Sequence, residues 1–135
     1  MSTQIFVNLP VRDLDKSKAF FAALGHATNP QFTDENAACV VISDTIYVML
    51  LVEPFFQGFT RKAICDARTH TEVILCLSAD SRAAVDAMVG KALAAGGTEP
   101  MEAKDYGFMY QRSFQDPDGH LWEIVHMDEG AMPAD

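Results

Sequence analysis

The sequence predicts an α+β fold made of two tandem β-α-β-β-β modules. The chain has 135 residues, of which 49% are hydrophobic and 21% are charged, and this suits one ordinary domain or two fused half-size modules. One succession of signals occurs twice: a strand, a capped helix that ends at glycine, and three further strands. A single module leaves an open sheet edge and an uncovered apolar face, so two modules can pair and share a core.

The first module spans about residues 1–53. Its helix is predicted to begin after Asp13 or Asp15, because a short carboxylate accepts hydrogen bonds from the free N–H groups of a first helical turn. Gly25 suits the position just past the helix, where a left-handed backbone is common. Polar breaks between the later strands indicate turns. The expected strands are residues 4–9, 27–32, 37–42 and 45–52.

The second module spans about residues 72–128 and repeats this order. Asp80 or Ser81 is the expected cap of a helix over 82–95, which Gly96-Gly97 ends. The sequence Asp-Pro-Asp-Gly at 116–119 predicts a type I turn before the last strand. The expected strands are residues 72–79, 98–103, 107–114 and 120–127.

Residues 53–71 join the two modules. Phe55, Phe56 and Phe59 would be unfavourable in a solvated tether, so a short helix or a packed loop is expected there. The modules together are expected to form one domain over residues 1–128, followed by a polar tail at 129–135.

Charge and composition exclude several classes of partner. A net charge of −9 leaves no basic surface for nucleic acid or for an anionic membrane. No apolar run reaches the roughly 20 residues that span a bilayer, and no secretory signal opens the chain, so a cytoplasmic protein is expected. The odd cysteine count, without a C-x-x-C pair, predicts neither a disulfide framework nor structural zinc. Cys39 and Cys76 lie in apolar runs, which predicts small core residues.

Glu123 is the candidate functional carboxylate. Alternation along the last strand places it on one face with Leu121 and Val125, and a carboxylate among apolar neighbours is costly to bury without a partner. It could serve as a metal ligand or as a general base. Two plainer interpretations stay open, a solvated sheet face and an interior ion pair with Arg112.

Three stretches resemble the vicinal oxygen chelate superfamily of glyoxalases, bleomycin-resistance proteins and extradiol dioxygenases. They are NLPVRDL at 8–14, LCLSAD at 75–80 and DPDGHLWE at 116–123, and with the duplicated module order the resemblance covers about residues 4–127. The resemblance implies a glyoxalase-like fold, in which both modules curve into a cup-shaped mixed sheet. It also implies a homodimer.

In this family four positions commonly hold a divalent metal, and the resemblance carries them to Phe6, Met49, Ile74 and Glu123. Phenylalanine and isoleucine have no donor atom, and a methionine thioether is a poor ligand for a hard or borderline cation. The usual metal site is therefore expected to be degenerate, and no cofactor is expected. A divalent metal stays the alternative, through a displaced set of His70, Glu72 and Glu123.

Strand alternation predicts the lining of the cup. Besides Glu123, the expected ligand-binding residues are Phe6, Asn8, Tyr47, Met49, Ile74, Cys76 and Val125. This mostly apolar set with a few polar groups suits a small, partly apolar ligand. The alternative is that these side chains fill the cup as core. Cys76 is expected to be an inert thiol rather than a nucleophile, because no base or positive charge is placed beside it.

Three functions follow from this set. The first is a small-molecule binding protein of the bleomycin-resistance kind. The second is a metal-dependent lyase or isomerase of glyoxalase type, similar to lactoylglutathione lyase, in which Glu123 moves a proton. The third is a metal-free enzyme that uses Glu123 alone. Extradiol ring cleavage is the least favoured, because its iron needs two histidines that these positions do not supply.

Overall fold

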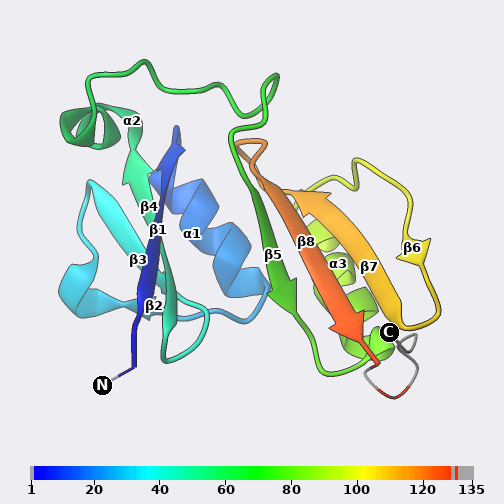
Figure 1. The fold of residues 1–135 in the computed structure, drawn as a ribbon. Coiled ribbons are helices and arrows are strands. Elements are labelled where there is room, and N and C mark those ends of the chain that lie inside the picture. Colours follow the sequence, from blue (N-terminus) through cyan, green and yellow to red (C-terminus); the bar gives the residue numbers. More distant parts are fainter. Residues whose placement is uncertain (1, 129, 131–135) are drawn as a thin grey trace. The chain divides into compact units, whose positions relative to one another are not determined.

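The structure is a computed structural model that describes residues 2–128 and 130. Apart from Gly130, the expected polar tail lies outside the described residues. The chain divides into two compact units, residues 1–66 and 67–135, and each contains a four-stranded mixed sheet with one long helix (Figure 1). Within the described part of the chain, no helix combines the length and the apolar character needed to cross a membrane.

The first unit has the strand order β1-β4-β3-β2. β1 runs parallel to β4, and the other pairs are antiparallel. A short helix and a 3-10 turn follow the sheet, as expected for the segment after residue 52, but Phe55 and Phe59 are exposed rather than packed. Its elements are β1 Ile5–Val11, α1 Leu14–Ala23, β2 Thr28–Asn29, η1 Pro30–Phe32, β3 Ala37–Val41, β4 Ile46–Val52, α2 Glu53–Phe56 and η2 Gln57–Phe59.

The second unit repeats this topology, with the strand order β5-β8-β7-β6 and β5 parallel to β8. The repetition confirms the predicted α+β class with two β-α-β-β-β modules. Its elements are β5 Ile74–Ser78, α3 Arg82–Ala94, β6 Lys104–Asp105, β7 Met109–Gln115 and β8 Leu121–Met127.

Local side-chain chemistry sets the ends of both long helices. The Asp13 carboxylate accepts a hydrogen bond from the Lys16 N–H at 3.1 Å, and the Ser81 hydroxyl accepts one from the Ala84 N–H at 3.0 Å. Asp13 and Ser81 are thus the caps, rather than Asp15 and Asp80. Past the helices, Gly25 has a φ of 99°, the left-handed backbone expected at this position.

Each long helix covers one face of the sheet in its own unit. In the first unit the buried Phe20 and Phe21 of α1 belong to the core with Leu50 of β4. In the second unit α3 contributes Val85, Val89 and Ala92, and the sheet contributes Phe114, Trp122 and Ile124. Each sheet therefore keeps a second face that its helix does not cover, which we call its open face.

Two predicted strands are wrong in extent. The strand expected over 27–32 reduces to β2, because Pro30 starts a 3-10 turn and Asn29 caps it by accepting from the Gln31 N–H at 3.0 Å. The strand expected over 98–103 is absent. That segment makes one isolated bridge, Thr98 to Gln115, and the edge strand β6 forms later in the chain.

The Asp-Pro-Asp-Gly turn is built around a buried carboxylate. The Gly119 N–H donates to the Asp116 carbonyl at 2.9 Å, which closes the predicted turn. The Asp116 side chain accepts from the N–H groups of Asp118 and His120 and from Trp122 Nε1 at 3.1 Å. Gly119 has a φ of 89°, and a Cβ there would lie 2.9 Å from the backbone of Ala67 and Arg68, so the turn admits only glycine at this position. This turn fixes where β8 begins and therefore where Glu123 lies along it.

Candidate functional site

Glu123 lies in the middle of the open face of the second unit. β8 occupies a central place in its sheet, between β5 and β7. The register puts Cys76 of β5 on one side of Glu123 and Ser113 of β7 on the other. Because cross-strand partners point to the same face, these three side chains form a row of one thiol, one carboxylate and one hydroxyl.

The Glu123 carboxylate is half-buried and makes no hydrogen bond or ion pair with another described residue. A small pocket of about 20 Å³ adjoins it, and this is room for roughly one water molecule. Its lining mixes charged and neutral polar groups with one thioether: Met101, Glu102, Lys104, Gln111, Arg112, Ser113 and Glu123. A half-buried carboxylate beside open space is available to a ligand that donates a hydrogen bond.

The alternative interpretation of Glu123, an ion pair with Arg112, is wrong. Arg112 pairs across the strands with Ile124, so its side chain lies on the helix side of the sheet. There it forms ion pairs with Glu99 at 2.9 Å and with Asp86 at 3.0 Å. The pairing register of β7, which puts Ser113 rather than Arg112 beside Glu123, causes the difference.

Cys76 differs from the prediction of a core residue, because it is exposed on the open face of the edge strand β5. Burial by its surroundings and, to a smaller extent, the neighbouring Glu123 carboxylate raise the pKa of its thiol. A raised pKa keeps the sulfur protonated at neutral pH, and this agrees with the expected unreactive thiol. Cys39 is buried, as predicted.

The open face of the first unit is apolar and aromatic. Phe6 and Tyr47 are cross-strand partners, and their rings stack with centroids 4.8 Å apart and an interplanar angle of 10°. Asn8 and Met49 form the next pair along the same two strands. The Asn8 amide donates to the Phe6 carbonyl at 3.3 Å, and the Tyr47 hydroxyl donates to the Asp44 carbonyl at 2.9 Å.

The eight predicted site residues thus form two groups of four, one on each open face. The first unit carries Phe6, Asn8, Tyr47 and Met49, and the second carries Ile74, Cys76, Glu123 and Val125. None of the eight is fully buried, and Phe6 and Ile74 are about half exposed, at 48% and 50%. Side chains that only filled a core would be enclosed.

The donor set does not fit a divalent metal. Of the four positions that the resemblance carried over, only Glu123 has an oxygen or nitrogen donor in its side chain, and one carboxylate is too few for a tight site. Across residues 2–128 and 130, no three His, Cys, Asp or Glu side chains come together as a group able to hold a metal ion. The displaced set of His70, Glu72 and Glu123 therefore does not assemble in this structure.

Sequence reasoning missed the polar neighbours that β7 and β6 bring to Glu123. Ser113 lies beside Glu123, and Gln111 and Lys104 are paired in the next row of the sheet. The alternation of side chains in 109–115 carries the signal, but its phase relative to β8 depends on the pairing register. Counting back from the turn at 116–119, which joins β7 to β8 as a hairpin, would have fixed that register.

Comparisons with known proteins agree with this architecture. A family model described as bleomycin resistance protein-like N-terminal matches residues 3–43. A hypothetical protein from S. aureus is 30% identical, with a TM-score of 0.78, and the match covers 93% of this chain and 95% of that one. A glyoxalase/bleomycin resistance protein/dioxygenase family enzyme from Burkholderia phytofirmans is 18% identical, with a TM-score of 0.77 and coverage of 93% and 99%. An antibiotic binding protein from Streptomyces is 19% identical, with a TM-score of 0.66 and coverage of 94% and 97%. No curated protein matches the chain.

The duplicated module, the DPDG turn before the last strand and these matches define a glyoxalase-like fold. The chain belongs to the vicinal oxygen chelate superfamily, which unites glyoxalases, bleomycin-resistance proteins and extradiol dioxygenases.

Proposed function

We propose that the chain binds small, partly apolar molecules on the open faces of its sheets, with Glu123 as the main polar contact on the open face of the second unit. The observation that carries this proposal is the Glu123 carboxylate, half-buried on an open face and without a partner among the described residues. Such a group is better satisfied by a donor on a bound molecule than by leaving it partly desolvated.

The other residues of the open faces support the same function. Phe6 and Tyr47 offer a stacked aromatic surface, and Ile74 and Val125 offer aliphatic surface around Glu123 and Cys76. Small-ligand sites combine mostly apolar walls with few polar groups in this way. The antibiotic binding protein from Streptomyces has the same fold and carries a name that states small-molecule binding. For a bound molecule with an acidic proton, Glu123 would act as general base.

The three free cysteines suit a reducing compartment, so we place this function in the cytoplasm. We further propose that the working form is a homodimer, because the edge strands β1 and β5 carry exposed apolar side chains.

Dye binding tests the apolar part of the site. We expect the neutral dye Nile red to bind with increased fluorescence, and the Phe6→Ala variant to bind it several-fold more weakly, because a large part of an aromatic contact is lost. Phe32→Ala is the matched control, since Phe32 is 59% exposed but lies on η1, away from the open face. Equal losses in the two variants would show that the dye reports general surface hydrophobicity, and this would contradict the proposal.

Metal analysis separates binding from the glyoxalase-type alternative. Because Phe6, Met49 and Ile74 replace three of the four ligands, we expect clearly less than one divalent ion per chain in protein purified without a metal-affinity tag. One tightly held Zn, Ni, Mn or Fe per chain that is lost in Glu123→Gln would overturn this expectation and favour a metal-dependent lyase or isomerase.

A further inference from the structure

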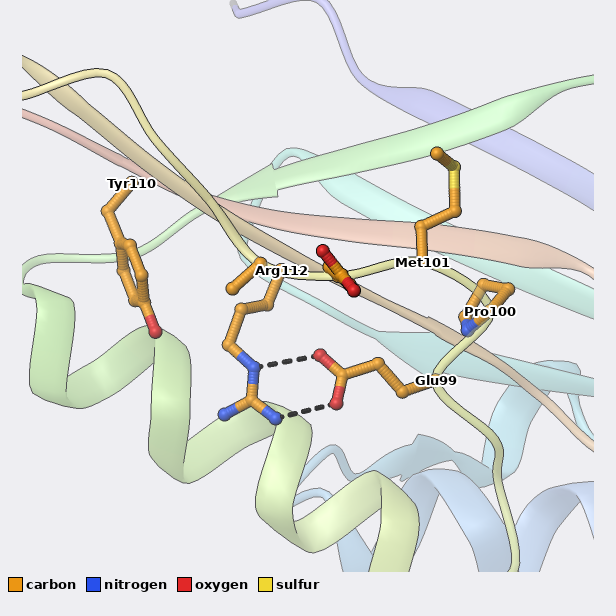
Figure 2. Close-up of a pocket in the computed structure, with 7 residues that line it drawn as sticks. Glu99, Pro100, Met101, Tyr110 and Arg112 are labelled. Atoms are coloured by element: carbon orange, nitrogen blue, oxygen red, sulfur yellow. Dashed lines mark hydrogen bonds and ion pairs between the residues drawn. The ribbon is translucent and has the colours of Figure 1, made fainter.

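The second unit contains a larger pocket that none of the predicted site residues lines. It has a volume of about 630 Å³ and lies among the 99–103 loop and two side chains of β7 (Figure 2). Its lining consists of Glu99, Pro100, Met101, Glu102, Ala103, Tyr110 and Arg112. This volume is in the range of sites that hold small organic molecules.

This pocket lies on the opposite side of β7 from the Glu123 row. Tyr110 and Arg112 pair with His126 and Ile124, whereas Gln111 and Ser113 pair with Val125 and Glu123. The side chains of Tyr110 and Arg112 point toward α3 (Figure 2). There both donate hydrogen bonds to the Asp86 carboxylate. The two β7 side chains of this pocket therefore lie on the other side of the sheet from the Glu123 row, although the pocket shares Met101, Glu102 and Arg112 with the small pocket beside Glu123.

The one cation in the lining is already neutralised. Arg112 donates from Nε and Nη2 to the two carboxylate oxygens of Glu99, both at 2.9 Å, and from Nη1 to Asp86 at 3.0 Å. These bonds, the Glu99 pair first, raise the pKa of Arg112, and in return they hold the pKa of Glu99 below its usual range. Two carboxylates around one guanidinium leave no net positive charge to attract an anion.

Glu102 is the carboxylate that remains. It is exposed, and no hydrogen bond or ion pair joins it to another described residue. Around it, Pro100, Met101 and the Tyr110 ring supply apolar surface. On the Tyr110 ring, Arg82 already lies 5.1 Å from the centroid, and Asp105 neutralises Arg82 through an ion pair at 2.8 Å.

From this charge balance we propose that the pocket binds a small organic cation, an ammonium group carried on an apolar or aromatic body. The ammonium pairs with Glu102, and the body packs on Met101, Pro100 and Tyr110. Among the lining residues two carboxylates face one guanidinium, and the whole chain carries a net charge of −9, so both local and long-range fields favour a cation. This site does not depend on the function proposed for the open faces.

The test uses benzyltrimethylammonium as the probe and protein labelled with ¹³C at the methionine methyl groups. We expect saturable shifts of the Met101 methyl signal, while the Met49 methyl, on the open face of the first unit, stays unchanged. The anion 3-phenylpropionate, of similar size, should bind more weakly. Raising the salt concentration should weaken binding of the cation, since the pair with Glu102 is exposed.

Three variants locate the charge that matters. Glu102→Gln should weaken binding about threefold, the scale of one solvent-exposed charge pair. Glu123→Gln should weaken it less than Glu102→Gln does, because Glu123 borders only the neighbouring small pocket, and Glu72→Gln should leave it unchanged, because Glu72 precedes β5. Three results would overturn the proposal: equal affinity in Glu102→Gln, a loss in Glu123→Gln of similar size, or movement of Met49 in place of Met101.

Discussion

Asp116 shows how a single buried carboxylate holds the start of the strand that carries Glu123. Its two oxygens accept three hydrogen bonds, two from backbone N–H groups of the turn and one from Trp122 Nε1. Burial raises the pKa of this carboxyl, and the His120 charge and these donors act against that rise. The turn and the buried Trp122 thus depend on one side chain.

Replacing Asp116 with alanine should therefore destabilise the protein strongly. We expect a loss of about 3 kcal/mol in the free energy of unfolding, because buried donors lose their acceptor. Urea unfolding followed by fluorescence of Trp122 measures the change. Asp80→Ala is the control, since Asp80 is exposed and does not cap α3. A loss below about 1 kcal/mol in Asp116→Ala, the level of an ordinary surface change, would show that the turn stands without its carboxylate.

Glu99 gives a pH dependence of known sign. Its hydrogen bonds with Arg112 lower its pKa, so the unfolded chain binds the proton more readily than the folded protein. The stability from this pair is fully present above the unfolded value of about 4.3 and is lost as pH falls through the lower folded value.

Glu99→Gln should remove that dependence. At neutral pH we expect a loss of about 1 kcal/mol, reduced from a buried pair by partial solvent exposure. Between pH 6 and about pH 3 the difference in stability between wild type and variant should shrink, because the Glu99 carboxylate of the wild type becomes protonated. Thermal melts across this range measure it, and Glu72→Gln serves as the control. Asp116 has a raised pKa and so contributes to the pH dependence of stability with the opposite sign. Because wild type and Glu99→Gln both contain Asp116, its contribution cancels when their stabilities are subtracted. A constant gap at every pH would mean that Glu99 acts by packing alone.

At the scale of elements, local chemistry made the prediction succeed, and strand pairing made it fail. The helices could be predicted because their caps and terminal glycines lie next to them in sequence. The extents of the strands expected at 27–32 and 98–103 were not predicted correctly, because hydrophobic alternation alone was used. Alternation does not show that Pro30 starts a 3-10 turn or that the edge strand β6 forms only at Lys104. The alternative that paired Glu123 with Arg112 was wrong for a different reason, because it ignored the register that the turn at 116–119 sets. The face of Arg112 follows from the register between β7 and β8, and a shift of one residue reverses every side chain.

Ser81 offers a test of one such local rule. Its hydroxyl accepts the Ala84 N–H at 3.0 Å, whereas Asp80 lies one residue outside the helix. Ser81→Ala should cost about 1 kcal/mol of stability, and Asp80→Ala should stay within about 0.5 kcal/mol of wild type. Urea unfolding of both variants gives the comparison. A larger loss of stability in Asp80→Ala than in Ser81→Ala would show that Asp80, rather than Ser81, caps α3.

At the scale of the whole molecule, the same topology is built twice from different side chains. Both units pair their first and last strands in parallel and keep their helix on one face. The two open faces have diverged: the first is aromatic at Phe6 and Tyr47, and the second is polar at Cys76, Glu123 and Ser113. A duplicated fold thus provides two chemically distinct surfaces, whereas strand alternation alone predicts a single cup lined by residues of both modules.

Each sheet also leaves its first strand at an edge, and these edge strands carry exposed apolar side chains. Ile5 and Phe6 on β1 are 54% and 48% exposed, and Ile74 on β5 is 50% exposed. Unpaired strand edges and uncovered apolar side chains favour association with a further copy, and two-fold dimers are the commonest outcome.

We therefore expect a dimer of twice 14.8 kDa at micromolar concentration, measured by light scattering after size exclusion. Ile74→Lys should shift the protein toward monomer, because it places a charge on the apolar edge strand, whereas Leu93→Lys on α3 should not. A 14.8 kDa species for the wild type, or equal dissociation in both variants, would exclude an interface at β5.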